Sequence, residues 1–246
     1  MNTNSETGHA KNVANFEQLV LNCTSYGRAY NPGNPALSLE ALNTLLSEGK
    51  QCLTSIHTVQ ASLAKALSER EVAFEPFSKL ATRIANAVRS SASSPQADTQ
   101  VIAIIRKLQG RRAAPKMTEE EKQAASSEGK EVVEISASQM SFTNRIANFD
   151  KLIELLKSIR EYTPNESDLT VTALTTYHQD LTTKNQAVIN AEISVSSLRI
   201  TRNNLLYKET TGMIDVAAAV KTYIKSVFGA TSPQYKQISS LKFVRR

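Results

Sequence analysis

Apolar residues recur at spacings of three and four along most of the 246-residue chain, which is typical of amphipathic helices. The first such stripe predicts a helix over about residues 13–29, and the stretch YNPGNP ends it because Pro and Gly do not continue a helix. Its apolar positions are Val13, Phe16, Leu19, Val20 and Cys23. A matching stripe predicts a second such helix that begins near Ile146 and is closed by YTPNESD.

The next predicted helix in each half is long. Between Leu39 and Leu67, the positions at alternating spacings of three and four are apolar over four heptads except at Gly49 and Gln60, which favours packing along a neighbouring helix. Thirty helical residues span roughly 45 Å, more than the first helix can cover. We therefore expect a third helix, after Pro76 in one half and after Gly212 in the other, to cover the rest. The alternative is a broken second helix that gives a compact four-helix bundle.

Each half also ends with the motif SPQ. Ser is a favoured helix N-cap and Pro a favoured first helical residue, so Ser94-Pro95 and Ser232-Pro233 predict the start of a last helix. The second of these helices is the shorter, and residues 242–244 after it either fray or extend as a strand.

These matches indicate one unit written twice. NVANFEQLV at Asn12 is repeated as RIANFDKLI at Arg145, an offset of 133 residues, and the two SPQ motifs follow in the same order at an offset of 138. An internal repeat of this length fixes the architecture. We expect an all-α protein of two tandem, homologous, elongated helical bundles, each with three to four antiparallel helices.

The predicted boundaries are a disordered tail over 1–11, repeat 1 over 12–112, a charged linker over 113–141 and repeat 2 over 142–246. The linker has 3 Lys and 6 Glu, and Thr118 with Glu121 forms a capping box that predicts a short helix within it. The two repeats carry net charges of +4 and +5, and the whole chain +6.

The amino-acid composition gives only limited information about the cellular compartment of the protein. Apolar content of 41% and charged content of 21% suit a globular protein. The first residues lack the apolar core of a secretory signal, and no apolar run reaches the length of a membrane span, so we expect a cytoplasmic protein. We interpret Cys23 and Cys52, both in apolar helical stretches, as two buried thiols rather than a disulfide.

No catalytic or metal-binding signature is present in the sequence, and we expect no cofactor and no enzyme activity. His9 lies in the predicted tail, and His178 occupies a seam position typical of a half-buried histidine. Glu69, Glu71 and Glu75 cluster before Pro76 without a matching histidine, so a solvated face or an ion-pair network explains them better than a catalytic pair.

Basic clusters at the ends of the two repeats are the candidate interaction residues: Arg106, Lys107, Arg111, Arg112, Lys242, Arg245 and Arg246. Cations at helix C-termini are stabilised by the helix dipole, which is the simplest explanation. The same clusters could contact an acidic protein surface or nucleic acid. A net charge of +6 is small for a nucleic-acid-binding protein of this length, so we do not favour nucleic acid.

The stretches SFTNRIANFDKLIELL and TYIKSVFGATSPQYKQISSLKF resemble a family of uncharacterised, all-helical bacterial proteins with the same duplicated layout. The resemblance runs from about Asn12 onward. It implies the fold and a bacterial source, and no activity.

Two functions fit these observations. The first is a non-enzymatic structural or scaffolding protein that self-associates as a homo-oligomer, in a filament or lattice, because duplicated units present similar surfaces twice. The second is a module that binds nucleic acid or another polyanion through its basic clusters. A third, an enzyme whose site is assembled from residues distant in sequence, is the least supported.

Overall fold

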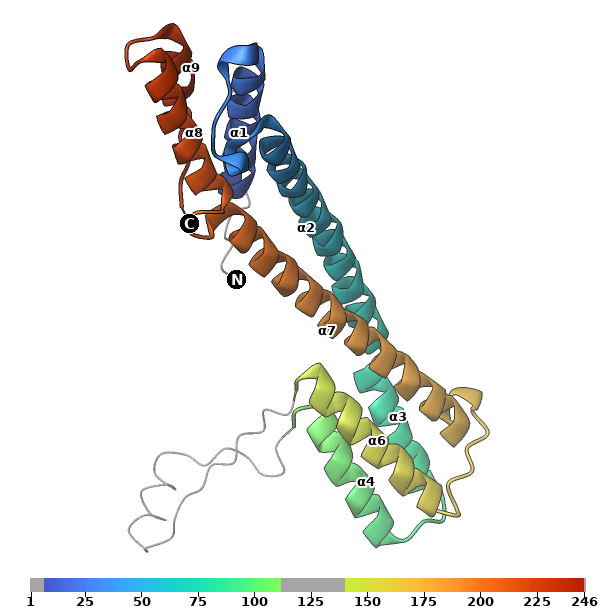
Figure 1. Ribbon diagram of the computed structural model, residues 1–246. Helices are drawn as coiled ribbons and strands as arrows, with labels where there is room; N and C mark the ends of the chain where they lie inside the picture. The colour runs from blue at the N-terminus through green and yellow to red at the C-terminus, as the bar shows by residue number, and fades with distance from the viewer. Residues whose placement is uncertain (1–6, 112–139, 246) are drawn as a thin grey trace, which may run out of the picture. The chain divides into compact units, whose positions relative to one another are not determined.

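The computed structural model describes residues 7–111 and 140–245, and all regular structure in these ranges is helical (Figure 1). The prediction of an all-α protein is confirmed. The first half contains α1 (Thr7–Ser25), α2 (Leu39–Phe74), α3 (Phe77–Ser90) and α4 (Pro95–Leu108). The second half contains α6 (Phe142–Ser158), α7 (Val171–Tyr207), α8 (Met213–Phe228) and α9 (Pro233–Ser239). Short 3-10 turns lie at Gly27–Ala29, Pro35–Leu37 and Ser167–Leu169.

The two long helices are continuous. α2 has 36 residues and α7 has 37, and neither contains a proline that would break it. The alternative of a broken second helix is therefore wrong.

The predicted helix starts after the SPQ motifs are confirmed. The side chain of Ser94 accepts a hydrogen bond from the amide of Ala97, and that of Ser232 accepts one from Tyr235. Pro95 and Pro233 occupy the first turn of α4 and α9. Helix order is the same in the two halves, which agrees with a duplication; the duplication itself stays a prediction.

The chain divides into two compact units, and each unit takes helices from both halves. Unit 1 comprises residues 1–63 and 191–246, so it holds α1, the start of α2, the end of α7, α8 and α9. Unit 2 comprises residues 64–190, with the end of α2, α3, α4, α6 and the start of α7. The predicted bundles over 12–112 and 142–246 are therefore not the compact units.

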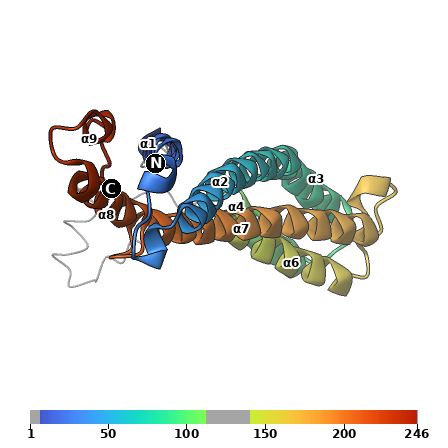
Figure 2. The ribbon, with the colours of Figure 1, turned by 45° about the horizontal axis from the view of Figure 1, so that its top comes forward.

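Each unit combines both halves because the apolar faces of the first helices pack on helices of the other half. In unit 1, α1 packs against α8 and α9 of the opposite half, as Figures 1 and 2 show. In unit 2, α6 packs against α4, and α3 packs against α4. The first helix of each half therefore completes the core of helices that belong to the other half.

Each unit has its own hydrophobic core. Phe16 of α1, Leu42 of α2 and Val220 of α8 are fully buried in the core of unit 1. Phe77 of α3, Leu108 of α4 and Phe149 of α6 are almost fully buried in the core of unit 2. Burying one large apolar side chain stabilises the fold by about 1.5–3 kcal/mol. The two cores are therefore the main source of stability.

Three local predictions need correction or lie outside the description. The predicted tail over 1–11 ends early, because α1 begins at Thr7 and buries His9. The apolar stripe of the third helix of the second half, from Ile214 to Val227, predicts that Val227 faces the core, but Val227 is 44% exposed. The linker helix at Thr118 falls within residues 112–139, outside the described residues. Among the described helices, none combines the length and the apolar character that a transmembrane span requires.

Candidate interaction sites

The basic cluster of the first half lies at the C-terminal end of α4, in unit 2. Arg106, Lys107 and Arg111 are exposed, and Gly110 ends the helix with a φ of 66°. The amide of Arg111 donates to the carbonyl oxygen of Arg106 at 2.8 Å, which is the bond of a Schellman-type helix end. The helix dipole stabilises cations at this position. Arg112 lies outside the described residues.

The basic cluster of the second half lies in unit 1 and is partly neutralised. Arg245 forms an ion pair with Asp215 and donates a second hydrogen bond, of 2.7 Å, to the carbonyl oxygen of Tyr207. Lys242 is exposed, and Arg246 lies outside the described residues. The ion pair holds the pKa of Asp215 below its usual range. Within the described residues, Arg245 is thus engaged by its own chain.

Residues 241–245, which we call the C-terminal strap, follow α9 and are held mainly through their backbone. The carboxamide of Asn12 makes two bonds to Val244: its Oδ1 accepts from the amide at 3.0 Å, and its Nδ2 donates to the carbonyl at 2.9 Å. Asn15 donates to the carbonyl oxygen of Lys242 at 2.6 Å. Asn12 therefore satisfies Val244 as a neighbouring β-strand would.

The other end of the strap is held by α8. Lys221 Nζ donates to the carbonyl oxygen of Leu241, and the same ammonium lies 5.3 Å from the centre of the Phe243 ring. Burial lowers the pKa of Lys221. A half-buried cation thus bonds the strap at one carbonyl and one aromatic ring.

A buried polar network lies beneath the strap. Asn12 is 2% exposed and His9 is 4% exposed. His9 Nδ1 lies 2.6 Å from the hydroxyl of Tyr207, and Asn12 Nδ2 lies 3.4 Å from the same hydroxyl. The prediction that His9 lies in a tail is wrong, and no prediction was made for Asn12. Their spacing from Phe16, at seven and four residues, places both on the buried face of α1 and could have revealed them.

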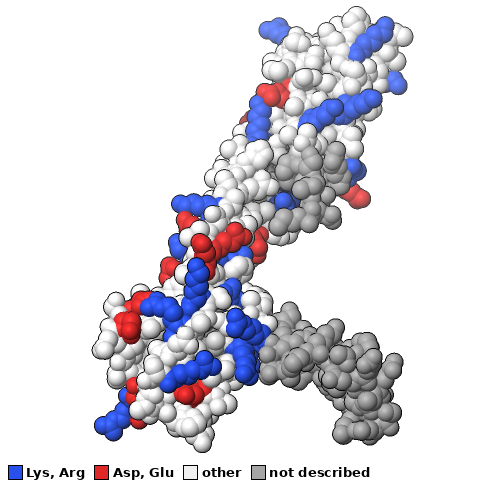
Figure 3. Space-filling model, turned by 180° about the vertical axis from the view of Figure 1, so that it is seen from behind, with Lys and Arg blue, Asp and Glu red and all other residues white. Residues whose placement is uncertain are grey.

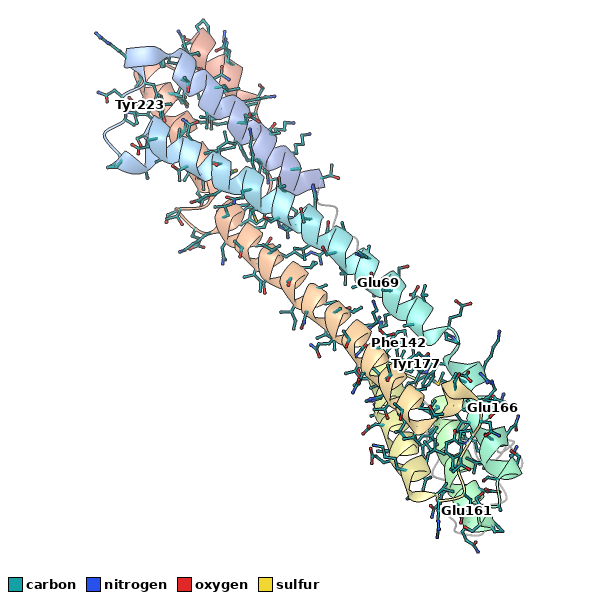
Figure 4. The ribbon with its side chains drawn as sticks, turned by 90° about the vertical axis from the view of Figure 1, so that its right-hand side faces the viewer. Glu69, Phe142, Glu161, Glu166, Tyr177 and Tyr223 are labelled. Carbon is teal, nitrogen blue, oxygen red and sulfur yellow. The ribbon has the colours of Figure 1, made fainter. Side chains whose placement is uncertain are left out.

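Unit 2 contains a cluster of aromatic rings with two guanidinium groups stacked on it. Its rings are Phe74, Phe77, Phe142, Phe149 and Tyr177. Arg70 lies 3.9 Å above the centre of the Phe142 ring, and Arg145 lies 4.7 Å from that of Phe77. Phe142 and Tyr177, from α6 and α7, are labelled in Figure 4. Burial lowers the pKa of Arg145. Cation–π contacts offset part of the loss of hydration of these groups.

The predicted glutamate cluster resolves into one paired and two exposed carboxylates. Glu69 lies 3.0 Å from Lys184 and 3.8 Å from Lys65, and the bond to Lys184 lowers the pKa of Glu69. Glu71 and Glu75 are exposed. This agrees with the expected ion-pair network and solvated face.

A polar cavity of about 650 Å³ lies in unit 2 between the end of α3 and the segment from Glu161 to Leu169. Glu161 and Glu166, labelled in Figure 4, line it, and Arg83 at its edge is paired with Asp168. The described residues hold no group of three His, Cys, Asp or Glu side chains placed to bind a metal ion. Nothing in this lining selects one ligand chemistry.

The two cysteines are buried, as predicted, and neither is in a disulfide within the described structure. Burial raises the pKa of Cys23 to about 12, so its thiol stays protonated and unreactive at neutral pH. Cys52 Sγ lies 3.9 Å from the carbonyl oxygen of Leu198.

Charge on the visible surface is mixed rather than uniformly basic. On the face seen in Figure 3, unit 2 presents Lys and Arg side chains next to Asp and Glu side chains. Comparison with protein-family models, with curated proteins and with solved structures found no match to this chain.

Proposed function

We propose that this chain is a non-enzymatic structural protein that self-associates, and that its assembly uses the same helix pairings that join its two halves. The observation that carries the proposal is the composition of the units. Each unit buries its core only by combining helices from the first half with helices from the second.

The same pairings can form between copies. Where α6 of one copy packs on α4 of another, and α1 of one on α8 of another, every side chain meets the partner that it meets within a single chain. The exchanged form keeps nearly all the contacts of the single chain. The protein concentration therefore sets the balance between the monomer and the exchanged oligomer. Reciprocal exchange gives a dimer, and one-way exchange gives an open filament.

Exposed apolar side chains supply a further surface. Ile193 is 59% exposed and Ile200 is 61% exposed, and a spacing of seven places both on one face of α7 in unit 1. Leu21 of α1 is also 62% exposed. Aliphatic side chains on one helix face favour helix pairing between copies.

Sedimentation velocity of the purified protein over a range of concentrations, with electron microscopy of the same samples, tests the proposal. We expect the mean mass to rise with concentration and elongated particles to appear. A strict monomer at high micromolar concentration contradicts the proposal. The variant Ile193→Ser/Ile200→Ser should reduce association, whereas Thr58→Ser, an exposed change on α2, should not.

A second function has one supporting observation. Arg106, Lys107 and Arg111 are exposed and lie within six residues, as a polyanion-binding site requires. In a mobility-shift assay with nucleic acid, replacing these three residues by Ala should weaken binding and flatten its salt dependence. Arg245→Ala should have little effect, because Arg245 is already paired with Asp215.

A further inference from the structure

The strap site of unit 1 points to a specific contact between copies: we propose that it binds residues 241–245 of a second chain in place of its own strap. The inference rests on the proposed self-association and names the segment and the site that carry it.

The site recognises an extended backbone and one arginine. Asn12, Asn15 and Lys221 bond to the carbonyl oxygens of Val244, Lys242 and Leu241, and Asn12 also bonds to the amide of Val244. These bonds are made by any extended segment in the same register. Arg245 fixes that register, because its guanidinium reaches both Asp215 and the carbonyl of Tyr207. The one sequence shown to satisfy all these groups is that of the strap itself.

The strap is attached by few apolar contacts. Lys242 and Arg245 are exposed, Val244 is 55% exposed, and Leu241 and Phe243 are only half-buried. The deeply buried anchor nearest to it in the chain is Ile238 of α9. Release at residues 239–240 therefore exposes little apolar surface, and the hydrophobic effect opposes it weakly.

The site, in contrast, is poorly suited to stay empty. With the strap in place Asn12 is 2% exposed, and loss of the strap removes both of its bonds to Val244 and leaves the 3.4 Å contact between its Nδ2 and the Tyr207 hydroxyl. A strap from either the same chain or a second copy restores both bonds, so the two straps compete for one site. Release of one strap thus favours capture of a strap from a second copy. Reciprocal capture closes a twofold pair, and one-way capture extends a chain of copies.

Cross-linking between two full-length variants tests the exchange. One carries Asn15→Cys and the other Lys242→Cys, and the mixture is treated with a short bis-maleimide. Asn15 and Lys242 are joined by a bond of 2.6 Å in the folded chain, so a captured strap brings the two new thiols within reach. The natural cysteines are buried and should not react. We expect a cross-linked heterodimer, and a several-fold lower yield when the Lys242→Cys chain also carries Arg245→Ala.

The matched control replaces Asn15→Cys by Thr24→Cys, an exposed position nine residues further along α1 and on its opposite face. A heterodimer specific to Asn15→Cys supports strap exchange. Equal yields from the two pairs overturn it, as does association in sedimentation without a specific cross-link; in both cases the proposed self-association stands. Absence of both cross-link and association overturns the exchange and the proposed function together.

Discussion

Tyr162 and Leu169 are joined by a buried hydrogen bond of 2.8 Å, in which the tyrosine hydroxyl donates to the carbonyl oxygen seven residues further on. Unit 1 contains the same arrangement, with Tyr30 donating to the carbonyl of Leu37 at 2.7 Å. Each bond closes the loop between the first and the long helix of its half. The loop of each half is thus held in shape by one side chain.

Removing this hydroxyl should destabilise the protein. Tyr162→Phe keeps the ring but leaves the Leu169 carbonyl without its donor, so we expect the free energy of unfolding to fall by about 1 kcal/mol. Chemical denaturation measures the change. Tyr235→Phe is the control, because the hydroxyl of Tyr235 has no hydrogen-bond partner among the described residues; a similar loss there contradicts the assignment.

Tyr162 and a second tyrosine, the half-buried Tyr177, make the stability of the protein depend on alkaline pH. Burial, with Glu166 and Asp168 nearby, raises the pKa of Tyr162 to about 12, and burial raises the pKa of Tyr177 to about 12. In the unfolded chain tyrosine titrates near pH 10. A pKa raised in the folded state means that stability is complete below about pH 10 and is lost as pH rises towards about 12. Denaturation at increasing pH should show this loss, and Tyr162→Phe should reduce its slope.

Replacing Arg70 by lysine should destabilise the protein. Its guanidinium stacks on Phe142 at 3.9 Å and donates to Asn185 Oδ1 at 3.1 Å, a geometry that an ammonium does not reproduce. We expect Arg70→Lys to lower the free energy of unfolding by about 1 kcal/mol. In a double-mutant cycle, Phe142→Leu should cost less in the Arg70→Lys background. Additive effects would mean that the two side chains are not coupled.

Gly212 should tolerate no side chain. A Cβ built at this position lies 2.6 Å from the carbonyl oxygen and 2.7 Å from the nitrogen of Lys208, and backbone atoms cannot move aside cheaply. We expect Gly212→Ala to lower the free energy of unfolding by about 1–3 kcal/mol. Gly33→Ala is the control, because a Cβ there meets no atom within 4 Å. Equal stability of the two variants would show that the turn before α8 adapts.

Cutting the chain between its halves should leave the protein assembled. A protease site introduced within residues 112–139, cleaved after purification, separates α1–α4 from α6–α9. Because both units need helices from both fragments, we expect the fragments to elute together in gel filtration and to separate only in denaturant. Fragments that separate while still folded would contradict the division into composite units.

Local structure followed from the sequence because its causes are local. Ser94 and Ser232 cap the helices that follow them because their side chains accept hydrogen bonds from amides of the first turn. The proline-free heptads after Leu39 favoured one long helix, and the structure shows that it is continuous. Choice of partner is different. The stripe containing Phe16 shows that one face of α1 is buried. Apolar packing is not specific for a partner, so this face could pack on α3 of its own half as well as on α8.

The strap site was hidden for a similar reason. Asn12 is one polar residue in an apolar stripe, and its bonds go to Val244, which is 232 residues away in the chain. Because the Asn12 side chain bonds to backbone atoms, which every residue has, the sequence at Val244 gives no sign of this partner. Asp215 and Arg245 carry opposite charges, yet many such pairs exist in the chain, and only the folded structure selects this one.

The composition of the units also sets the order in which the two cores can form during synthesis on the ribosome. Unit 2 is a single stretch, residues 64–190, and can close its core once that stretch has emerged. Helix α1 is made first, but α8 and α9, which cover Phe16 and its neighbours, are made last. The first apolar surface to leave the ribosome is thus the last to be covered. During that interval the apolar face of α1 is exposed, and exposed apolar surface makes an incompletely folded chain prone to aggregation.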